Sequence, residues 1–127
     1  MIVFSSKTGN NRRFVGKLDL PCIEITDDLV VSEPFVLLTY TTGMGQVPDP
    51  VKRFMERDGH KDLIVAVSSS GNRNWGKAYG RAANLIASQY NVPILSKFEM
   101  SGTQGDIEIF KERYDALWQN GSLLTMS

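Results

Sequence analysis

Short apolar runs, typical of buried strands, alternate along this sequence with longer segments whose apolar residues recur at helical spacing. The short runs predict five strands, over residues 2–4, 22–25, 35–40, 63–67 and 93–99. Helical spacing predicts four helices, over residues 10–18, 49–58, 78–90 and 107–118. Asp49 and Pro50 mark the start of the second helix, as an N-cap oxygen followed by a proline in the first turn.

Strands that alternate with helices predict a parallel sheet covered by helices on both faces. Five strands within 127 residues favour a three-layer α/β fold of the flavodoxin-like type, with strand order 2-1-3-4-5, over the larger dinucleotide-binding fold. The sequence contains no repeat and no linker, so we predict a single domain over residues 1–121 and a loose tail at 122–127. In such a sheet the ligand lies beyond the carboxyl ends of the strands.

Composition and charge narrow the classes of function. Fourteen basic residues balance fourteen acidic ones, so no overall field attracts the chain to nucleic acid or to a membrane. No apolar segment approaches the roughly 20 residues of a membrane helix, and the N-terminus lacks the pattern of a secretion signal. Cys22 is the only cysteine, which excludes an intrachain disulfide and a cysteine metal cluster, and we expect it to be buried. These features predict a cytoplasmic protein without a metal site.

The loop after the first strand, SSKTGNN, is rich in hydrogen-bonding groups and directly precedes a predicted helix. A helix N-terminus offers free backbone N–H groups and a partial positive charge, so it attracts an anion without needing lysine. Hydroxyls, amides and a glycine would complete a phosphate site here: Ser5, Ser6, Thr8, Gly9, Asn10 and Asn11. The alternative is an ordinary strand-to-helix turn, because the P-loop motif GxxxxGK[ST] is absent.

Three further loops are predicted to reach the same edge of the sheet. The loop after the third strand suits either a planar ligand or a mobile connector, and its candidate residues are Thr41, Thr42, Gly43, Met44 and Gly45. The candidates in the loop after the fourth strand are Ser70, Gly71, Asn72, Asn74 and Trp75. The tryptophan either stacks on an aromatic ligand or folds back on the core. The loop after the fifth strand either contacts the ligand or only caps the last helix, and its candidates are Gly102 and Thr103.

A phosphate pocket beside the first strand, with ring-edge loops after the third and fourth strands, is the layout that flavin mononucleotide (FMN) requires. A receiver domain would need acidic residues after the first strand and an aspartate after the third, where this chain has serine, threonine and tyrosine. A low-molecular-weight tyrosine phosphatase would need a cysteine in the first loop, but Cys22 lies elsewhere. His60 is the single histidine and is expected in an exposed turn, so hydrolysis by a histidine base is poorly supported.

Four segments carry specific motifs: FSSKTGNNRRF, residues 40–48, SGNRNWGKAYGRAANLIA and FEMSGTQGDIE. Together they resemble the NrdI family, the flavodoxin-like partners of class Ib ribonucleotide reductase, over nearly the whole chain. The resemblance implies an FMN protein that works with the radical-carrying subunit of that reductase in deoxyribonucleotide synthesis. In the family, reduced flavin reacts with dioxygen and supplies a superoxide-type oxidant. The oxidant supports assembly of the dimanganese–tyrosyl radical cofactor, whose manganese belongs to the partner.

The resemblance also implies roles for individual residues. The loop at 5–11 would hold the phosphate, and the loop at 41–45 would line one edge of the isoalloxazine ring. Asn72, Asn74 and Trp75 would line the other side, with the loop at 102–103 nearby. Asn11 replaces a threonine that is common in flavodoxin-type loops, and the loop at 43–45 is short for the family. No side chain acts as a general acid or base in this interpretation, because the flavin carries the reaction.

The charge pattern around the predicted site gives a separate argument about chemistry. Flavodoxins that shuttle single electrons crowd carboxylates around the flavin, which disfavours its anionic fully reduced form. The segments 41–48 and 69–77 contain no Asp or Glu, whereas Arg73 and Lys77 are cationic, so the reduced anion should form more readily. The two cations are alternatively a solvated rim or a docking patch for an acidic partner. The other hypotheses are a generic flavodoxin-type electron-transfer protein and an interaction module that has lost its flavin.

Overall fold

The computed structural model of the protein describes residues 1–43 and 45–119, so Met44 and the predicted tail at 122–127 lie outside the described residues. Five parallel strands form one sheet in the order β2-β1-β3-β4-β5, which confirms the prediction. The strands are β1 (Ile2–Phe4), β2 (Cys22–Glu24), β3 (Phe35–Tyr40), β4 (Ile64–Gly71) and β5 (Ile94–Glu99). The helices are α1 (Asn10–Leu18), α2 (Asp49–Met55), α3 (Arg81–Tyr90) and α4 (Gln104–Gln119), with two 3-10 segments, η1 (His60–Asp62) and η2 (Arg73–Ala78).

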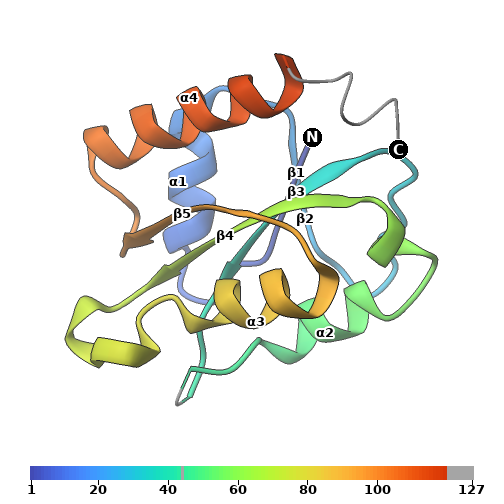
Figure 1. The fold of residues 1–127 in the computed structure, drawn as a ribbon, viewed down its shortest axis with the longest axis horizontal. Helices are drawn as coiled ribbons and strands as arrows, with labels where there is room; N and C mark the ends of the chain where they lie inside the picture. The colour runs from blue at the N-terminus through green and yellow to red at the C-terminus, as the bar shows by residue number, and fades with distance from the viewer. Residues whose placement is uncertain (44, 120–127) are drawn as a thin grey trace.

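Helices cover both faces of the sheet, α1 and α4 on one side and α2 and α3 on the other (Figure 1). Because successive strand residues point to opposite faces, Phe4 packs in the layer of α1 and α4, whereas Val3 packs in the layer of α2 and α3. Phe14 of α1 stacks on Phe98 of β5 with 3.8 Å between ring centroids, and it meets Phe110 of α4 edge to face. These contacts hold α1 against the sheet, with its N-terminus at the carboxyl ends of the strands.

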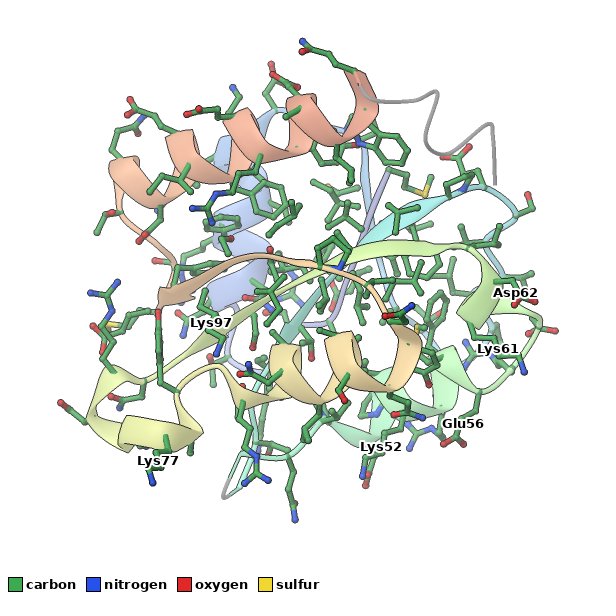
Figure 2. All side chains as sticks on the ribbon, viewed as in Figure 1. Lys52, Glu56, Lys61, Asp62, Lys77 and Lys97 are labelled. Carbon is green, nitrogen blue, oxygen red and sulfur yellow. The ribbon has the colours of Figure 1, made fainter. Side chains whose placement is uncertain are left out.

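Figure 2 labels charged side chains in two parts of the molecule. Lys52, Glu56 and Lys61 are exposed around α2 and η1. Lys77 and Lys97 lie at the other end of the molecule, beside η2 and β5 (Figure 2). Within residues 1–43 and 45–119, no helix combines the length and apolar character needed to cross a bilayer.

Several elements differ in extent from the prediction; α2, for example, ends at Met55 instead of residue 58, and α4 begins at Gln104 instead of residue 107. Strand β4 includes Ser68–Ser70, which were expected in a loop, and these serines pair with β3 and β5 in the middle of the sheet. The helix predicted over 78–90 begins only at Arg81, because Gly80 adopts a left-handed φ of 60° and ends the preceding turn. At the start of α2 the cap position is Pro48, and Asp49 is already helical.

Two expectations about single residues are wrong. Cys22 is exposed because it lies on β2, an edge strand of the sheet. His60 is fully buried rather than exposed. Its Nε2 accepts a hydrogen bond from the Val31 N–H at 3.0 Å, its Nδ1 donates to the Phe54 carbonyl at 2.7 Å, and its ring stacks on that of Phe54. Burial is tolerated because both ring nitrogens have partners.

Candidate functional site

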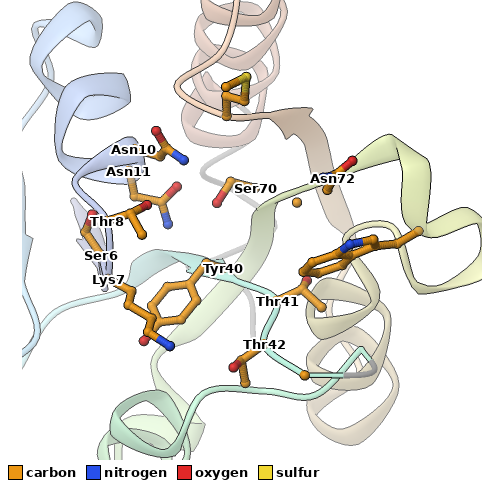
Figure 3. Close-up of a pocket in the computed structure, with 14 residues that line it drawn as sticks. Ser6, Lys7, Thr8, Asn10, Asn11, Tyr40, Thr41, Thr42, Ser70 and Asn72 are labelled. Carbon is orange, nitrogen blue, oxygen red and sulfur yellow. The ribbon is translucent and has the colours of Figure 1, made fainter.

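The loops that follow β1, β3, β4 and β5 surround a pocket of about 480 Å³ at the carboxyl edge of the sheet. Pockets for small molecules and cofactors span roughly 300–1,000 Å³. Figure 3 shows the α1 side of this pocket, with Ser6, Thr8 and Asn10, across from Asn72. The lining residues are Ser6, Lys7, Thr8, Asn10, Asn11, Tyr40, Thr41, Thr42, Gly43, Ser70, Gly71, Asn72, Trp75 and Met100.

The N-terminus of α1 forms one wall of the pocket. Gly9 holds the cap position with a left-handed φ of 86° and has no side chain to cap the helix. The neutral Ser6 hydroxyl accepts from the Arg12 N–H at 3.4 Å, and the first turn contains no acidic residue. The partial positive charge of the helix end is therefore not neutralised by the protein. Arg13 donates to Asn10 Oδ1 at 2.6 Å, so the amide nitrogen of Asn10 is left as a donor. Helix dipole, amide and the exposed hydroxyl of Thr8 together favour an oxyanion ligand.

Asn11 has a different role from its neighbour. Its side chain is 1% exposed, and its Nδ2 donates to the carbonyl oxygens of Ser5 at 2.8 Å and Thr39 at 2.9 Å. Asn11 therefore ties the carboxyl ends of β1 and β3 to the first turn of α1. Both of its donors are used, whereas Oδ1 is buried without a partner among the described residues. The side-chain group that remains for a ligand is an acceptor.

The loop after β3 is closed tightly at its base. The Thr42 N–H donates to the Gln46 carbonyl at 2.9 Å, and the Gln46 N–H donates to the Thr42 carbonyl at 2.7 Å. The hydroxyl of Thr41 accepts from the Ala82 N–H at 3.2 Å and lies 3.1 Å from the Ser69 hydroxyl. The Thr41 hydroxyl therefore links β3, β4 and α3 inside the protein. The next two residues of the loop, Thr42 and Gly43, line the pocket.

The segment after β4 forms the opposite wall. A Cβ at Gly71 would come within 2.8 Å of the Gly80 backbone nitrogen, so glycine is needed for the close approach of the two chains. Asn72 Oδ1 accepts from the Asn74 N–H at 2.8 Å and starts η2. Trp75 lines the pocket and remains 43% exposed instead of packing into the core. A flat aromatic ligand would cover this apolar surface.

The electrostatics of the pocket favour negative charge in a ligand. Among the described lining residues there is no carboxylate, and Lys7 is cationic. Two acidic residues nearby are engaged elsewhere: Glu99 accepts from the Arg73 N–H at 3.0 Å, and Asp106 accepts from the Thr103 N–H at 2.8 Å. Residues 1–43 and 45–119 contain no group of three or more His, Cys, Asp or Glu side chains that could hold a metal ion.

Several predicted site residues lie next to the pocket without lining it. Gly102 packs on a core ring, because a Cβ at this position would come within 2.7 Å of Phe14. Thr103 caps α4, since its hydroxyl accepts from the Asp106 N–H at 3.2 Å and donates to the Asp106 carboxylate at 3.1 Å. The described candidates outside the lining are Ser5, Gly9, Gly45, Asn74, Gly102 and Thr103.

Three lining residues were missed by the sequence analysis. Lys7 lies inside the predicted phosphate loop, and Tyr40 is the last residue of β3. The boundaries of the predicted strands could therefore have identified both residues as part of the site. Met100 directly follows β5 with a left-handed φ of 56° and is 67% exposed. A single sequence offers no sign of that conformation, because non-glycine residues adopt it rarely.

Comparison with known proteins identifies relatives over most of the chain. The family model described as NrdI Flavodoxin like matches residues 2–112. Protein NrdI of Bacillus licheniformis is 46% identical over 115 residues, covering 90% of this chain and 86% of the relative. Protein NrdI of Escherichia coli O127:H6 is 39% identical over 127 residues, covering 94% of this chain and 93% of the relative.

Solved structures with the same fold are more distant in sequence. A short-chain flavodoxin associated with a non-canonical PDU bacterial microcompartment superposes with a TM-score of 0.72 at 17% identity, covering 94% of this chain and 95% of the other. The flavodoxin of Streptococcus pneumonia TIGR4 gives a TM-score of 0.68 at 23% identity, covering 94% of this chain and 97% of the other. These likenesses describe the fold and confirm its flavodoxin-like class.

Proposed function

Because the chain belongs to the NrdI flavodoxin-like family, we propose that it binds FMN and acts as the redox activator of a class Ib ribonucleotide reductase. Membership confirms the resemblance that the SGNRNWG and GTQGDI motifs indicated. One observation carries the proposal. A helix N-terminus, hydroxyl and amide groups and a half-exposed tryptophan converge on one pocket whose described lining has no carboxylate.

The residues of the pocket fit the three parts of FMN. The N-terminus of α1, with Ser6, Thr8 and Asn10, would bind the phosphate. The buried Oδ1 of Asn11, which has no partner among residues 1–43 and 45–119, would accept a hydrogen bond from a ribityl hydroxyl, since a fully ionised phosphate has no proton to donate. The segments 40–43 and 70–72, with Trp75, would line the isoalloxazine ring.

FMN bound there would supply the redox chemistry, which is the transfer of electrons from a reductant to dioxygen. The product would be a superoxide-type oxidant, used to assemble the dimanganese–tyrosyl radical cofactor of the partner subunit. The chain's own contribution is to orient and to tune. The positive end of α1 and Lys7 favour an anionic ligand, and the lining residues bring no carboxylate to oppose one.

An absorbance spectrum of the purified protein, followed by FMN titration of the protein stripped of any chromophore, tests the binding. We expect a yellow protein, or a stripped protein that takes up FMN at one equivalent. A chain that neither carries nor takes up FMN would instead be an interaction module without flavin, and the proposal would be refuted.

Three variants test which residues bind the phosphate. Thr8→Ala and Asn10→Ala should each weaken FMN binding by about 1 kcal/mol, the usual net worth of one hydrogen bond. Thr103→Ala is the matched control, because its hydroxyl caps α4 through Asp106. We expect that control to lower the free energy of unfolding and to leave FMN affinity unchanged. Unchanged affinity in both Thr8→Ala and Asn10→Ala would overturn the phosphate assignment.

The alternative function is electron transfer of the generic flavodoxin type, which the overall fold equally allows. Anaerobic reductive titration separates the two functions. Reduction in two well-resolved one-electron steps supports the shuttle. Reduction without strong separation of the steps, with rapid reoxidation by dioxygen and radical formation in the manganese-loaded partner subunit, supports the activator.

A further inference from the structure

A second, shallow pocket of about 580 Å³ adjoins the first one. The 3-10 segment η2 contributes to both, with Trp75 in the first pocket and Gly76 and Lys77 in the second. The remaining residues of the second pocket come from the turn before α3, from α3 itself and from β5. We call this set the cationic pocket, and its described residues are Gly76, Lys77, Tyr79, Arg81, Asn84 and Lys97. It contains three cations and no carboxylate.

Lys97 is held in a defined position within the cationic pocket. Its stem lies across Gly80, where a Cβ would come within 2.7 Å of the Lys97 Cδ. Position 80 therefore needs glycine for two reasons: its φ of 60° is left-handed, and a Cβ would occupy the space of the Lys97 stem. The Nζ of Lys97 donates to the Tyr79 carbonyl at 3.3 Å and to Asn84 Oδ1. An ammonium has three donors, so one N–H remains for a further acceptor.

The charge of Lys97 is incompletely compensated. Its two acceptors are neutral, and partial burial lowers the pKa of its ammonium group. The ion pairs among the described residues involve other side chains, so Lys77, Arg81 and Lys97 have no carboxylate partner there. Three cations around one hollow repel each other, and an anion placed between them would relieve that repulsion.

Arg81 connects the cationic pocket to the first one. Its stem lies on Gly45, where a Cβ would come within 2.7 Å of the Arg81 Cδ and where φ is 100°. Gly45 belongs to the loop after β3, whose Thr42 and Gly43 line the first pocket. A group bound at Arg81 and Lys77 would therefore rest against both loops that the flavin ring would contact.

We propose that the cationic pocket is a docking site for carboxylate side chains on an acidic segment of the protein partner. The inference rests on the proposed function, in which that partner is the radical-carrying subunit of the reductase. Carboxylates match the site because Arg81 can bind one through two N–H groups while the lysines act as point charges. Docking here would place the partner beside the open edge of the flavin pocket.

Binding of the FMN-loaded protein to the manganese-loaded subunit tests the inference. We expect the double variant Lys77→Gln/Arg81→Gln, which changes two exposed side chains, to weaken binding on the order of tenfold at low salt, with a smaller difference at high salt. Lys52→Gln/Lys61→Gln also removes two positive charges, from exposed side chains at the opposite end of the molecule, and should bind like the wild type (Figure 2). Both variants should bind FMN with the affinity of the wild type. If the double variant kept wild-type affinity and salt dependence, the inference would be overturned.

A peptide experiment separates this inference from the proposed function. Hexaglutamate added to the FMN-loaded protein should shift the backbone amide resonances of residues 76–81 and 97, and hexaglutamine should not. The absence of such shifts would overturn the inference even if the reductase subunit binds. A wild-type protein that fails to bind the subunit counts against the proposed function, and the peptide result then decides the anion site by itself.

Discussion

Replacing Asn11 by aspartate would exchange two hydrogen-bond donors for an acceptor with almost no change in size. In the wild-type protein, Nδ2 donates to the carbonyls of Ser5 and Thr39 in a position that is 1% exposed. An aspartate oxygen in that place would face both carbonyl oxygens. We therefore expect Asn11→Asp to destabilise the fold by separating the first turn of α1 from the ends of β1 and β3.

The magnitude follows from the groups left without partners. A buried acceptor that loses its donor costs about 1–3 kcal/mol, so two carbonyls cost about 2–6 kcal/mol. The burial of a carboxylate adds to this cost. Since small domains are stable by only about 5–15 kcal/mol, the variant should be near the limit of folding. Asn11→Thr keeps one donor and should lose roughly half as much.

Urea denaturation of the FMN-free protein measures these differences. The control is Asn10→Asp, because Asn10 accepts from Arg13 and a carboxylate can take over that contact, with a change of under about 1 kcal/mol. Acidification should reduce the deficit of Asn11→Asp, because a protonated carboxyl regains one donor. Unfolding free energies of Asn11→Asp and wild type that agree within about 1 kcal/mol at neutral pH would refute the reasoning.

Three further predictions concern stability and the site. Gly102→Ala should lower the free energy of unfolding by about 2–5 kcal/mol, because its φ of 78° and the nearby Phe14 ring both oppose a Cβ. The control Gly59→Ala, with a φ of 72° but open space around it, should lower it by only about 1–2 kcal/mol. Equal losses of unfolding free energy in urea denaturation of the two variants would contradict this account. His60→Leu should cost about 2–6 kcal/mol by leaving a buried N–H and a buried carbonyl unpaired, so a thermal midpoint like that of the wild type would count against it. Thr41→Val should lower stability by about 1–2 kcal/mol and keep FMN affinity; the reverse result would mean that its hydroxyl binds the ligand.

The sheet and most of its connections could be predicted from the sequence. A strand such as β3, buried on both faces, must be apolar nearly throughout, and 35–40 is such a run. The same rule failed at the end of β4, because Ser68–Ser70 are polar yet buried in the sheet. There the serine hydroxyls find partners, as Ser68 does with Ser96 at 3.2 Å, and local polarity no longer marks a loop.

The candidate site was predictable as a set of loops but not residue by residue. Strand ends and glycine-rich segments located the lining from Ser6 to Trp75. The orientation of each side chain depended on partners far along the chain. Asn11 looked like a phosphate ligand, but its donors are taken by the Thr39 carbonyl, 28 residues away, and by the carbonyl of Ser5, directly after β1. Thr103 looked equally suitable, yet its hydroxyl serves the start of α4.

The sequence by itself determined the alternation of strands and helices, and with it a parallel sheet whose loops meet at one edge. It could do so because hydrophobic periodicity reports which face of each element is buried, and that information is local. Tertiary structure alone decided that His60 is buried between Val31 and Phe54, and that Lys97 and Arg81 share one hollow. Such pairings depend on distances between segments remote in sequence, which exist only once the layers have packed.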